Sequence, residues 1–302
     1  MFTPGYVYLS RTGELEELAR KAVERLRKCE MCPRRCGVNR LKDETGVCRT
    51  GRMAVVSSFH PHFGEEPPLV GYGGSGTIFF THCNLRCKYC QNYEISHLGE
   101  GRKVSSSELA DMMLSLQDVG CHNINLVTPS HVVPQILEAL DDAAARGLEI
   151  PIVYNTSSYD SPQTLRLLDG VVDIYLPDAK YWEKDTAGRL SGAPDYPDVM
   201  KDAIREMFRQ VGHLETRRVG DVRVAERGVL VRHLVLPGHL DETLRILEWL
   251  GKEFPGAHVN VMDQYWPAYR AREEEELRRR VTRKEMRAAL AKAKEMGLNL
   301  VY

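Results

Sequence analysis

Short apolar runs alternate with longer amphipathic segments from about residue 76 to the end of the chain. Each run is rich in leucine, β-branched or aromatic residues and is bounded by glycine, proline or polar residues, as buried strands are. The alternation of such strands with helices predicts an α/β fold with a parallel sheet. The predicted strands cover residues 77–80, 123–128, 152–155, 172–176, 230–236 and 259–262.

The segments between these runs carry apolar residues three and four positions apart, which predicts helices. Residues 105–116 are the clearest case, because Ser105 can cap the helix and Leu109, Met113 and Leu116 fall on one side of it. The other predicted helices cover residues 132–146, 162–168, 198–211 and 241–254.

Three segments depart from this rhythm. Residues 60–71 contain a proline pair and predict an ordered loop into the sheet, where Glu65 or Glu66 either contacts a ligand or remains an exposed charge. Residues 215–227 mix opposite charges around a Gly-Asp pair and predict an exposed hairpin. Residues 271–297 carry opposite charges four positions apart and predict an exposed C-terminal helix that closes the domain.

The composition narrows the function. The chain has 302 residues, with 41 Lys and Arg against 42 Asp and Glu and a formal net charge of -1. This balance argues against a protein that binds nucleic acids or membranes through its charge. The chain has no apolar run of about eighteen residues and its start is charged, so we expect a cytoplasmic protein.

The cysteines are the most informative residues. Eight cysteines in a chain predicted to be cytoplasmic are better candidates for metal ligands than for disulfides. Seven of them fall into two groups: Cys29, Cys32, Cys36 and Cys48, and then Cys83, Cys87 and Cys90. Cys121 stands alone and is expected to pack as a small apolar residue. We therefore divide the chain into a helix and four-cysteine metal-binding extension, residues 1–60, and an α/β unit, residues 61–302.

The second group has only three cysteines. A [4Fe–4S] cluster held by three thiolates keeps one iron free for a substrate or cofactor. A zinc held by these cysteines and either His82 or His97 is the rival interpretation. The position of the group, on a loop directly after a predicted strand, is where α/β folds place reactive groups.

The spacing C-x3-C-x2-C, with Tyr89 just before the third cysteine, resembles the signature of the radical S-adenosylmethionine (radical SAM) superfamily. The stretch FGEEPPLVGYGGSGTIFFTHCNLRCKYCQNYEISH is similar to the PflX-type branch of proteins related to pyruvate formate-lyase activating enzyme. The likeness continues through NLVTPSHVVPQIL, DIYLPDAKYW and HLVLPGH and covers most of the chain after about residue 50. It implies a partial (βα)6 radical SAM barrel, whereas the alternation of elements alone also permits an open doubly wound sheet.

The resemblance implies a mechanism. Cys83, Cys87 and Cys90 would hold a [4Fe–4S] cluster that binds S-adenosylmethionine, and one electron would cleave the cofactor to a 5′-deoxyadenosyl radical that abstracts hydrogen from a substrate. Tyr89 would lie against the adenine, or else be a packed aromatic ring. The substrate would be a protein or a small molecule, with activation of a glycyl-radical enzyme as the family-based hypothesis. The reductant would be of the flavodoxin or ferredoxin type.

Polar residues follow each predicted strand and are expected to face one cavity at the barrel mouth, although a polar residue at a strand end is often only a helix cap. Asp178 and Lys180 resemble a pair that lines the cofactor cleft of activating enzymes, and a local ion pair is the plainer interpretation. The other candidates for cofactor binding are Asn84, Thr128, Ser130, Asn155 and Ser157, and further polar residues at strand ends are His131, Thr156, His239, Asp263 and Gln264.

One feature of the activating enzymes is missing. They carry a Gly-Gly-Glu-like segment after the second strand that binds the ammonium group of the cofactor, whereas residues 125–131 here contain no carboxylate. Backbone carbonyls next to Pro129, or the hydroxyls of Thr128 and Ser130, are the alternatives.

The four N-terminal cysteines are expected to bind a second metal centre. A tetrathiolate site suits either a structural zinc or an auxiliary iron–sulfur cluster, and the spacing does not separate the two. Arg34, Arg35 and Arg40 would offset the negative charge of the thiolates in either case. A non-catalytic iron–sulfur electron carrier or a zinc-stabilised adaptor is the alternative to an enzyme.

Overall fold

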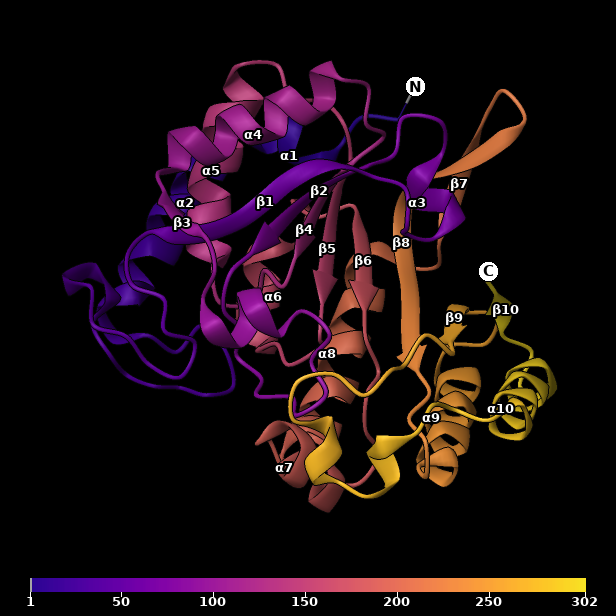
Figure 1. The fold of residues 1–302 in the computed structure, drawn as a ribbon. Coiled ribbons are helices and arrows are strands. Elements are labelled where there is room, and N and C mark those ends of the chain that lie inside the picture. Colours follow the sequence, from indigo (N-terminus) through magenta and orange to yellow (C-terminus); the bar gives the residue numbers. More distant parts are fainter. Residues whose placement is uncertain (1) are drawn as a thin grey trace.

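The computed structural model describes residues 2–302, whose strands and helices alternate along most of the chain (Figure 1). The strands are β1 Ala54–His62, β2 Ser75–Phe80, β3 Arg102–Val104, β4 Ile124–Val127, β5 Ile152–Thr156, β6 Ile174–Pro177, β7 Glu215–Val219, β8 Val222–Leu234, β9 His258–Met262 and β10 Asn299–Leu300. The α-helices are α1 Gly5–Thr12, α2 Glu14–Glu24, α3 Pro67–Val70, α4 Ser106–Asp118, α5 Val133–Ala145, α6 Pro162–Leu165, α7 Lys184–Ser191, α8 Tyr196–Val211, α9 Leu240–Glu253 and α10 Arg283–Glu295.

The strands form one sheet in the order β10-β9-β8-β6-β5-β4-β2-β1-β3, with β7 paired to β8 outside this path. Its six central strands, β2, β4, β5, β6, β8 and β9, are all parallel to their neighbours and follow one another in chain order. These are the six strands that the apolar runs predicted, so the predicted α/β fold with a parallel sheet is confirmed. Figure 1 shows the arrowheads of β2, β4, β5, β6 and β8 pointing toward the segment that follows β9.

The predicted helices are confirmed within a few residues. Ser105 caps α4 with a complete capping box, since its hydroxyl accepts from the Glu108 N–H while the Glu108 carboxylate accepts from the Ser105 N–H. The apolar side of α4, with Leu109 and Met113, is buried in the core. Helices α2, α4 and α5 pack together on one side of the sheet (Figure 1). Helix α7, which lies in a polar stretch, was not predicted.

The expected loop over residues 60–71 is wrong at both ends. Its last residues include the short helix α3, Pro67–Val70. Residues His60 and His62 belong to β1, which pairs antiparallel with β2 and extends the sheet beyond its parallel part. Pro61 is compatible with β1 because it lies one residue before the end of the strand. Strand β1 crosses residue 60, and the division of the chain at that residue stays a prediction.

The expected single helix over residues 271–297 is also wrong. Helix α10 begins only at Arg283, where Thr282 provides a capping box. Before it, residues 263–281 form an irregular segment with two short 3-10 turns that crosses the carboxyl ends of the strands (Figure 1). Tertiary ion pairs hold this segment, because Glu274 contacts both Lys88 and Arg189.

The predicted hairpin is confirmed by the antiparallel pair β7–β8, whose turn lies at Gly220 and Asp221. Among residues 2–302, the helices are all too short or too polar to cross a lipid bilayer.

Candidate functional site

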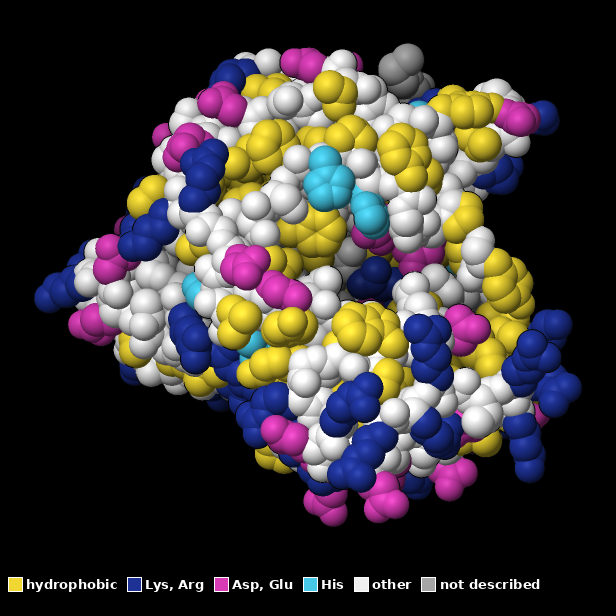
Figure 2. Space-filling view, in the orientation of Figure 1, with side chains coloured by type: hydrophobic (Ala, Val, Ile, Leu, Met, Phe, Trp, Pro, Cys, Tyr) yellow, Lys and Arg dark blue, Asp and Glu magenta, His cyan; other side chains and the backbone are white. Residues whose placement is uncertain are grey.

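A cavity of about 290 Å³ lies at the carboxyl ends of the parallel strands. Its walls come from the loop after β2 and from the ends of β4, β5, β6, β8 and β9, so all six central strands contribute to it. Figure 2 shows a hollow near the middle of this face, with charged side chains inside it. Ligand sites in α/β folds occur at this edge of the sheet.

The loop after β2 brings Cys83, Cys87 and Cys90 to this cavity. Each sulfur has a polar neighbour: the Leu85 N–H donates to Cys83 Sγ (3.4 Å), Ser191 Oγ donates to Cys87 Sγ (2.9 Å), and Ser96 Oγ lies 3.0 Å from Cys90 Sγ. Burial raises the pKa of the Cys83 thiol to about 12, and the charge of Cys87 adds to the rise. A bound cation would offset this cost, because it stabilises the thiolate.

The three thiols line one cavity with free space beside them. Three thiolates leave one iron of a [4Fe–4S] cluster without a protein ligand. Three cysteines beside an open cavity therefore suit a cluster with one free iron.

The two histidines of the rival zinc interpretation lie outside the cavity lining. The His97 ring stacks on Tyr269, with 4.5 Å between ring centroids, and its Nε2 lies 3.2 Å from the Cys87 carbonyl oxygen. His82 has a left-handed backbone, with φ of 71°, and its Nδ1 is buried without a partner.

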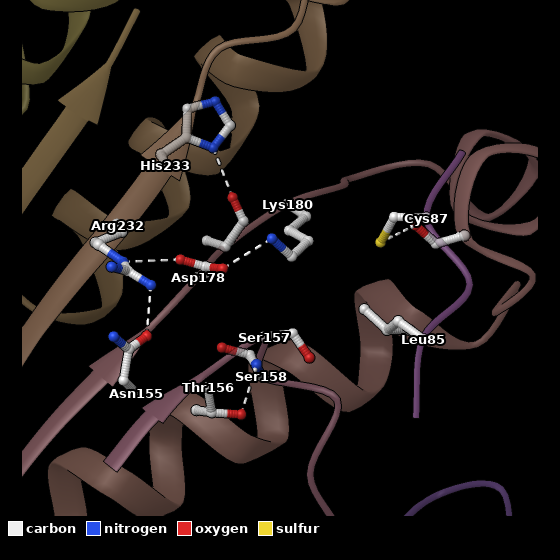
Figure 3. A network of polar contacts seen from close by, with 12 residues as sticks. Leu85, Cys87, Asn155, Thr156, Ser157, Ser158, Asp178, Lys180, Arg232 and His233 are labelled. Atoms are coloured by element: carbon white, nitrogen blue, oxygen red, sulfur yellow. Dashed lines mark hydrogen bonds and ion pairs between the residues drawn. The ribbon is translucent and has the colours of Figure 1, made fainter. Parts of the chain in front are cut away.

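Asp178, at the end of β6, lies between two cations in the cavity wall (Figure 3). Its carboxylate accepts from Lys180 Nζ at 2.7 Å and from Arg232 Nε at 3.0 Å. Burial alone would raise the pKa of Asp178, but the two cations outweigh it and lower that pKa. The ion pair expected for Asp178 and Lys180 is present, and both residues line the cavity.

Arg232 on β8 is the functional candidate that sequence reasoning missed. Its second NH group donates to Asn155 Oδ1 at 2.5 Å, and its first lies 3.5 Å from Glu65 Oε2. Figure 3 shows Arg232 beside Asp178 and Asn155, so it joins the ends of β5, β6 and β8. Its contact with Glu65 adds the loop before α3. The signal was available in the sequence, because a charged residue inside an apolar strand requires buried partners.

The two glutamates before α3 are both part of this interior network. Burial raises the pKa of Glu65, against the lowering effect of Arg232. Glu66 is buried, and its Oε1 accepts from Asn260 Nδ2 at 2.9 Å. Neither is the exposed loop charge that was the alternative for this pair.

The three residues at the end of β5 have different surroundings. Asn155, Thr156 and Ser157 all line the cavity. The Thr156 hydroxyl donates to Asp160 Oδ2 at 2.5 Å, whereas the buried Ser157 hydroxyl has no partner. A buried polar atom without a partner marks a place that a ligand can satisfy.

Tyr89 lines the cavity from the side of the cysteines and is only 5% exposed. Its hydroxyl accepts from the Tyr181 hydroxyl at 2.7 Å, and its ring meets Tyr181 and Tyr265 edge to face. It is therefore both a packed ring and part of the cavity wall.

Of the candidate residues after β4, only Thr128 lines the cavity. Thr128 lines the cavity and has a left-handed backbone, with φ of 62°. The chain turns there, so Ser130 and His131 leave the cavity wall, and the expectation that they face the barrel mouth is wrong. Ser130 Oγ instead lies 3.1 Å from Thr156 Oγ1.

The other candidates at strand ends also divide. Gln264 lines the cavity, whereas Asn84, His239 and Asp263 do not. His239 Nδ1 lies 3.1 Å from Glu242 Oε1. Asn84 is fully buried and donates through Nδ2 to the Tyr159 carbonyl at 2.7 Å.

The four N-terminal cysteines form a second, smaller site. Cys29, Cys32, Cys36 and Cys48 line a cavity of about 10 Å³. Gly46 makes it compact, since a Cβ at that position would lie 2.6 Å from Cys36 Sγ. The Val47 N–H donates to the same sulfur at 3.5 Å. Such short backbone-to-sulfur contacts suit a loop that folds around a thiolate centre.

Three arginines and a histidine also line this second site: Arg34, Arg35, Arg40 and His131. Arg40 NH1 donates to the His131 carbonyl at 2.8 Å and lies 3.8 Å from Cys29 Sγ. Burial lowers the pKa of His131 to about 3, and the charge of Arg40 adds to this effect. The three arginines expected to offset the thiolates therefore all line the cavity that the cysteines line.

Comparisons with known proteins bear on the first site. Residues 77–250 match the family model described as the Radical SAM superfamily. An uncharacterized protein of Methanocaldococcus jannaschii is 34% identical over 284 residues, which are 91% of this chain and 77% of that protein.

Solved structures were also compared. Streptococcus suis SuiB bound to S-adenosylmethionine is 10% identical, with a TM-score of 0.48, over 73% of this chain and 48% of that one. Methylornithine synthase (PylB) is 14% identical, with a TM-score of 0.42, over 74% of this chain and 69% of that one. The chain spans about half the length of the SuiB chain.

Proposed function

Because the chain belongs to the radical SAM superfamily, we propose that it reductively cleaves S-adenosylmethionine and abstracts hydrogen from a substrate with the resulting 5′-deoxyadenosyl radical. The family implies a [4Fe–4S] cluster and S-adenosylmethionine as cofactors. The observation that carries the proposal is the set of three cysteines on the loop after β2, beside a cavity that all six central strands line.

The donor set fits the cluster. Cys83, Cys87 and Cys90 would hold three of its irons, and the loop offers no fourth cysteine for the remaining one. When bound, the cluster supplies the low-potential electron that splits the sulfonium. Ser191 and Ser96, beside the Cys87 and Cys90 sulfurs, would donate hydrogen bonds that stabilise the thiolates.

The cavity wall offers partners for S-adenosylmethionine. Ser157 and Thr128 present hydroxyls, and Asp178 presents a carboxylate, which are acceptors for the cofactor ammonium in place of a Gly-Gly-Glu segment. Lys180 and Arg232 offer positive charge to its carboxylate. Tyr89 offers an aromatic surface to the adenine.

Each step balances in electrons and atoms. One electron from a flavodoxin- or ferredoxin-type donor reduces the sulfonium, which yields methionine and the 5′-deoxyadenosyl radical. That radical takes one hydrogen atom from the substrate and leaves a substrate radical. The buried Asp178, Lys180 and Arg232 network would hold the bound cofactor in place and limit the access of water.

A more specific role and architecture belong to the proposal. The sequence likeness to pyruvate formate-lyase activating enzyme favours a glycine of a partner protein as the hydrogen donor. We also assign the six parallel strands to the partial (βα)6 barrel of the family, with the cysteine-rich extension before it and α10 after it. A cytoplasmic location remains part of this proposal.

The test is anaerobic cofactor cleavage. Protein reconstituted with iron and sulfide should, on reduction with dithionite, convert S-adenosylmethionine to equal amounts of methionine and 5′-deoxyadenosine. Protein that binds only zinc, shows no iron–sulfur charge-transfer absorbance and cleaves no cofactor would be the adaptor instead. Deuterium transfer from candidate substrates into 5′-deoxyadenosine would then identify the hydrogen donor.

A further inference from the structure

The two cysteine sites are neighbours, although about 35 residues of sequence separate Cys48 from Cys83. Asn84 lies between them. Its Oδ1 is 3.8 Å from Cys83 Sγ in the first site. Arg34, which lines the second site, donates through Nε to the Asn84 carbonyl at 2.8 Å. Asn84 thus contacts a sulfur of the first site and an arginine that lines the second.

A second connection runs through Val47. Its N–H donates to Cys36 Sγ at 3.5 Å, and its carbonyl accepts from the Arg86 guanidinium. The charge of Arg86 in turn interacts with both Cys83 and Cys48. Short covalent and hydrogen-bonded paths of this kind are the ordinary medium for electron transfer between buried centres.

The second site carries two buried guanidinium nitrogens without partners. They are Arg34 NH2 and Arg40 NH2, and both side chains line the four-cysteine cavity. Buried N–H groups without partners are costly, so an anionic group between the cysteines would satisfy them. A cluster ligated by four thiolates is such a group, and its negative charge grows on reduction, which the two guanidinium groups would stabilise.

The segment around this site carries an excess of positive charge. Residues 25–52 contain nine Lys and Arg against three Asp and Glu, a net charge of +6 in a chain whose total is -1. Five of these basic residues and all three acidic ones are exposed. Lys28, Lys42 and Arg49 are among the five, and Lys28 and Arg49 adjoin Cys29 and Cys48. Figure 2 shows basic side chains at this end of the molecule, interspersed with acidic ones. An excess of positive charge attracts an acidic partner.

We propose that Cys29, Cys32, Cys36 and Cys48 hold a redox-active iron–sulfur cluster, which receives one electron from an acidic donor protein at the basic surface and passes it through Asn84 to the Cys83 site. This inference rests on the proposed function, since the electron is consumed there in splitting S-adenosylmethionine. The donor is oxidised by one electron and the sulfonium is reduced by one. The cluster at the second site returns to its starting state.

A structural zinc explains the four thiolates but not their connection to the first site or the basic residues around them. Zinc does not change its oxidation state, so it has no use for a connection to the first site or for a basic docking surface. The two assignments differ in metal content, which can be measured without any activity.

The first experiment isolates the second site. The variant Cys83→Ala/Cys87→Ala/Cys90→Ala is reconstituted anaerobically, and its iron, sulfide and zinc are counted. We expect about four irons per chain and an electron paramagnetic resonance signal on dithionite reduction. One zinc and no iron after the same treatment would overturn the proposal. Because no cofactor cleavage is involved, this result stands whether or not the proposed function holds.

The second experiment measures the route of the electron. Cofactor cleavage is driven either by dithionite, a small reductant that can reach the first site directly, or by a reduced acidic ferredoxin, and the ratio of the two rates is compared between variants. In Cys36→Ala we expect that ratio to fall at least about tenfold. An unchanged ratio would overturn the route, and failure of dithionite with the unaltered protein would instead contradict the proposed function.

A third variant keeps every cysteine and so avoids a loss of folding. Lys28→Glu/Lys42→Glu/Arg49→Glu reverses exposed basic charges outside the cavity lining and is expected to lower the ferredoxin-to-dithionite ratio about tenfold at low salt, less at high salt. Lys284→Glu/Arg287→Glu/Lys294→Glu makes the same change in charge on exposed positions of α10 and should leave the ratio unaltered. Equal ratios in the two variants would contradict docking at residues 25–52.

Discussion

The two cysteine sites differ in the number of ligands and in the room beside them. The site after β2 has three cysteines and opens onto about 290 Å³, whereas the N-terminal site has four and encloses about 10 Å³. The first is built on the rigid ends of parallel strands, and the second on a loop without strands between α2 and β1. A missing ligand and free space together allow a substrate to reach the metal, and a complete ligand set without space does not.

The two sites also differ in the charged residues that line them. The first site faces mixed charges that pair with one another, Asp178 with Lys180 and Arg232. Arg34, Arg35 and Arg40 line the second, and no carboxylate does. A mixed lining can bind a zwitterion such as S-adenosylmethionine, whereas a purely basic lining can only stabilise anionic ligands.

The largest effect is expected from removing one of the three cysteines of the site after β2. Cys87→Ala should abolish S-adenosylmethionine cleavage, by at least about a thousandfold, because the cluster loses one of three thiolates. Cys121→Ala, at a buried cysteine outside both sites, is the control and should retain cleavage. Rates of 5′-deoxyadenosine formation and far-ultraviolet circular dichroism provide the measurement. Full activity of a folded Cys87→Ala protein would remove the mechanism.

A smaller effect is expected from breaking the ion pairs of Arg232 in the wall of the cavity after β2. Arg232→Leu leaves Asp178 and Glu65 buried with fewer partners, so the free energy of unfolding should fall by about 3–5 kcal/mol. Arg223→Leu removes an exposed arginine from the same strand and should change stability very little. Urea denaturation of both variants measures the difference. Equal stability would show that the network is not a buried one.

The next change affects only the N-terminal site with four cysteines. Gly46→Ala places a Cβ 2.6 Å from Cys36 Sγ, so we expect a loss of about 1–3 kcal/mol in stability and less metal at the second site. Gly188→Ala in α7 is the control, since its Cβ meets nothing closer than 3.4 Å and alanine favours a helix. Thermal unfolding with metal analysis distinguishes them. Normal metal content in Gly46→Ala would show that the loop adapts.

The smallest expected effect is on stability and depends on pH. It concerns Glu242, which holds the backbone that follows β6 at the edge of the site after β2. Glu242 accepts from the N–H groups of Trp182 and Glu183, just after the β6 loop. These contacts and His239 outweigh burial and lower the pKa of Glu242 to about 2. Since this folded-state pKa lies below the unfolded value of 4.5, the stabilisation is complete above pH 4.5 and is lost as the pH falls toward 2.

Glu242→Gln should therefore be less stable than the unaltered protein by about 1–3 kcal/mol at pH 7, with a difference that shrinks below pH 4.5. Asp241→Asn, at an exposed aspartate on the same helix, should change stability very little over this range. Denaturation curves between pH 3 and pH 7 give the comparison. A difference that is constant over this range would contradict the assigned pKa.

Local patterns predicted much of the fold. The six apolar runs corresponded to β2, β4, β5, β6, β8 and β9, because buried parallel strands need continuous apolar sequence. Ser105 was predicted as a cap because capping depends on neighbours within four residues. Strand β1 and the irregular segment before α10 were not predicted, since pairing with β2 and the ion pairs of Glu274 involve distant partners.

The sequence by itself determined the grouping of seven cysteines, the choice of Cys83, Cys87 and Cys90 as a three-ligand set, and the strands that carry the polar ends. Ligand spacing and apolar runs are local, so they can be read from neighbouring residues. Only the tertiary structure decided that Arg232 joins Asp178 and Glu65, that Ser130 and His131 leave the cavity, and that Asn84 lies between the two sites. Those contacts join residues that the chain brings together only when the sheet forms, and no local pattern records them.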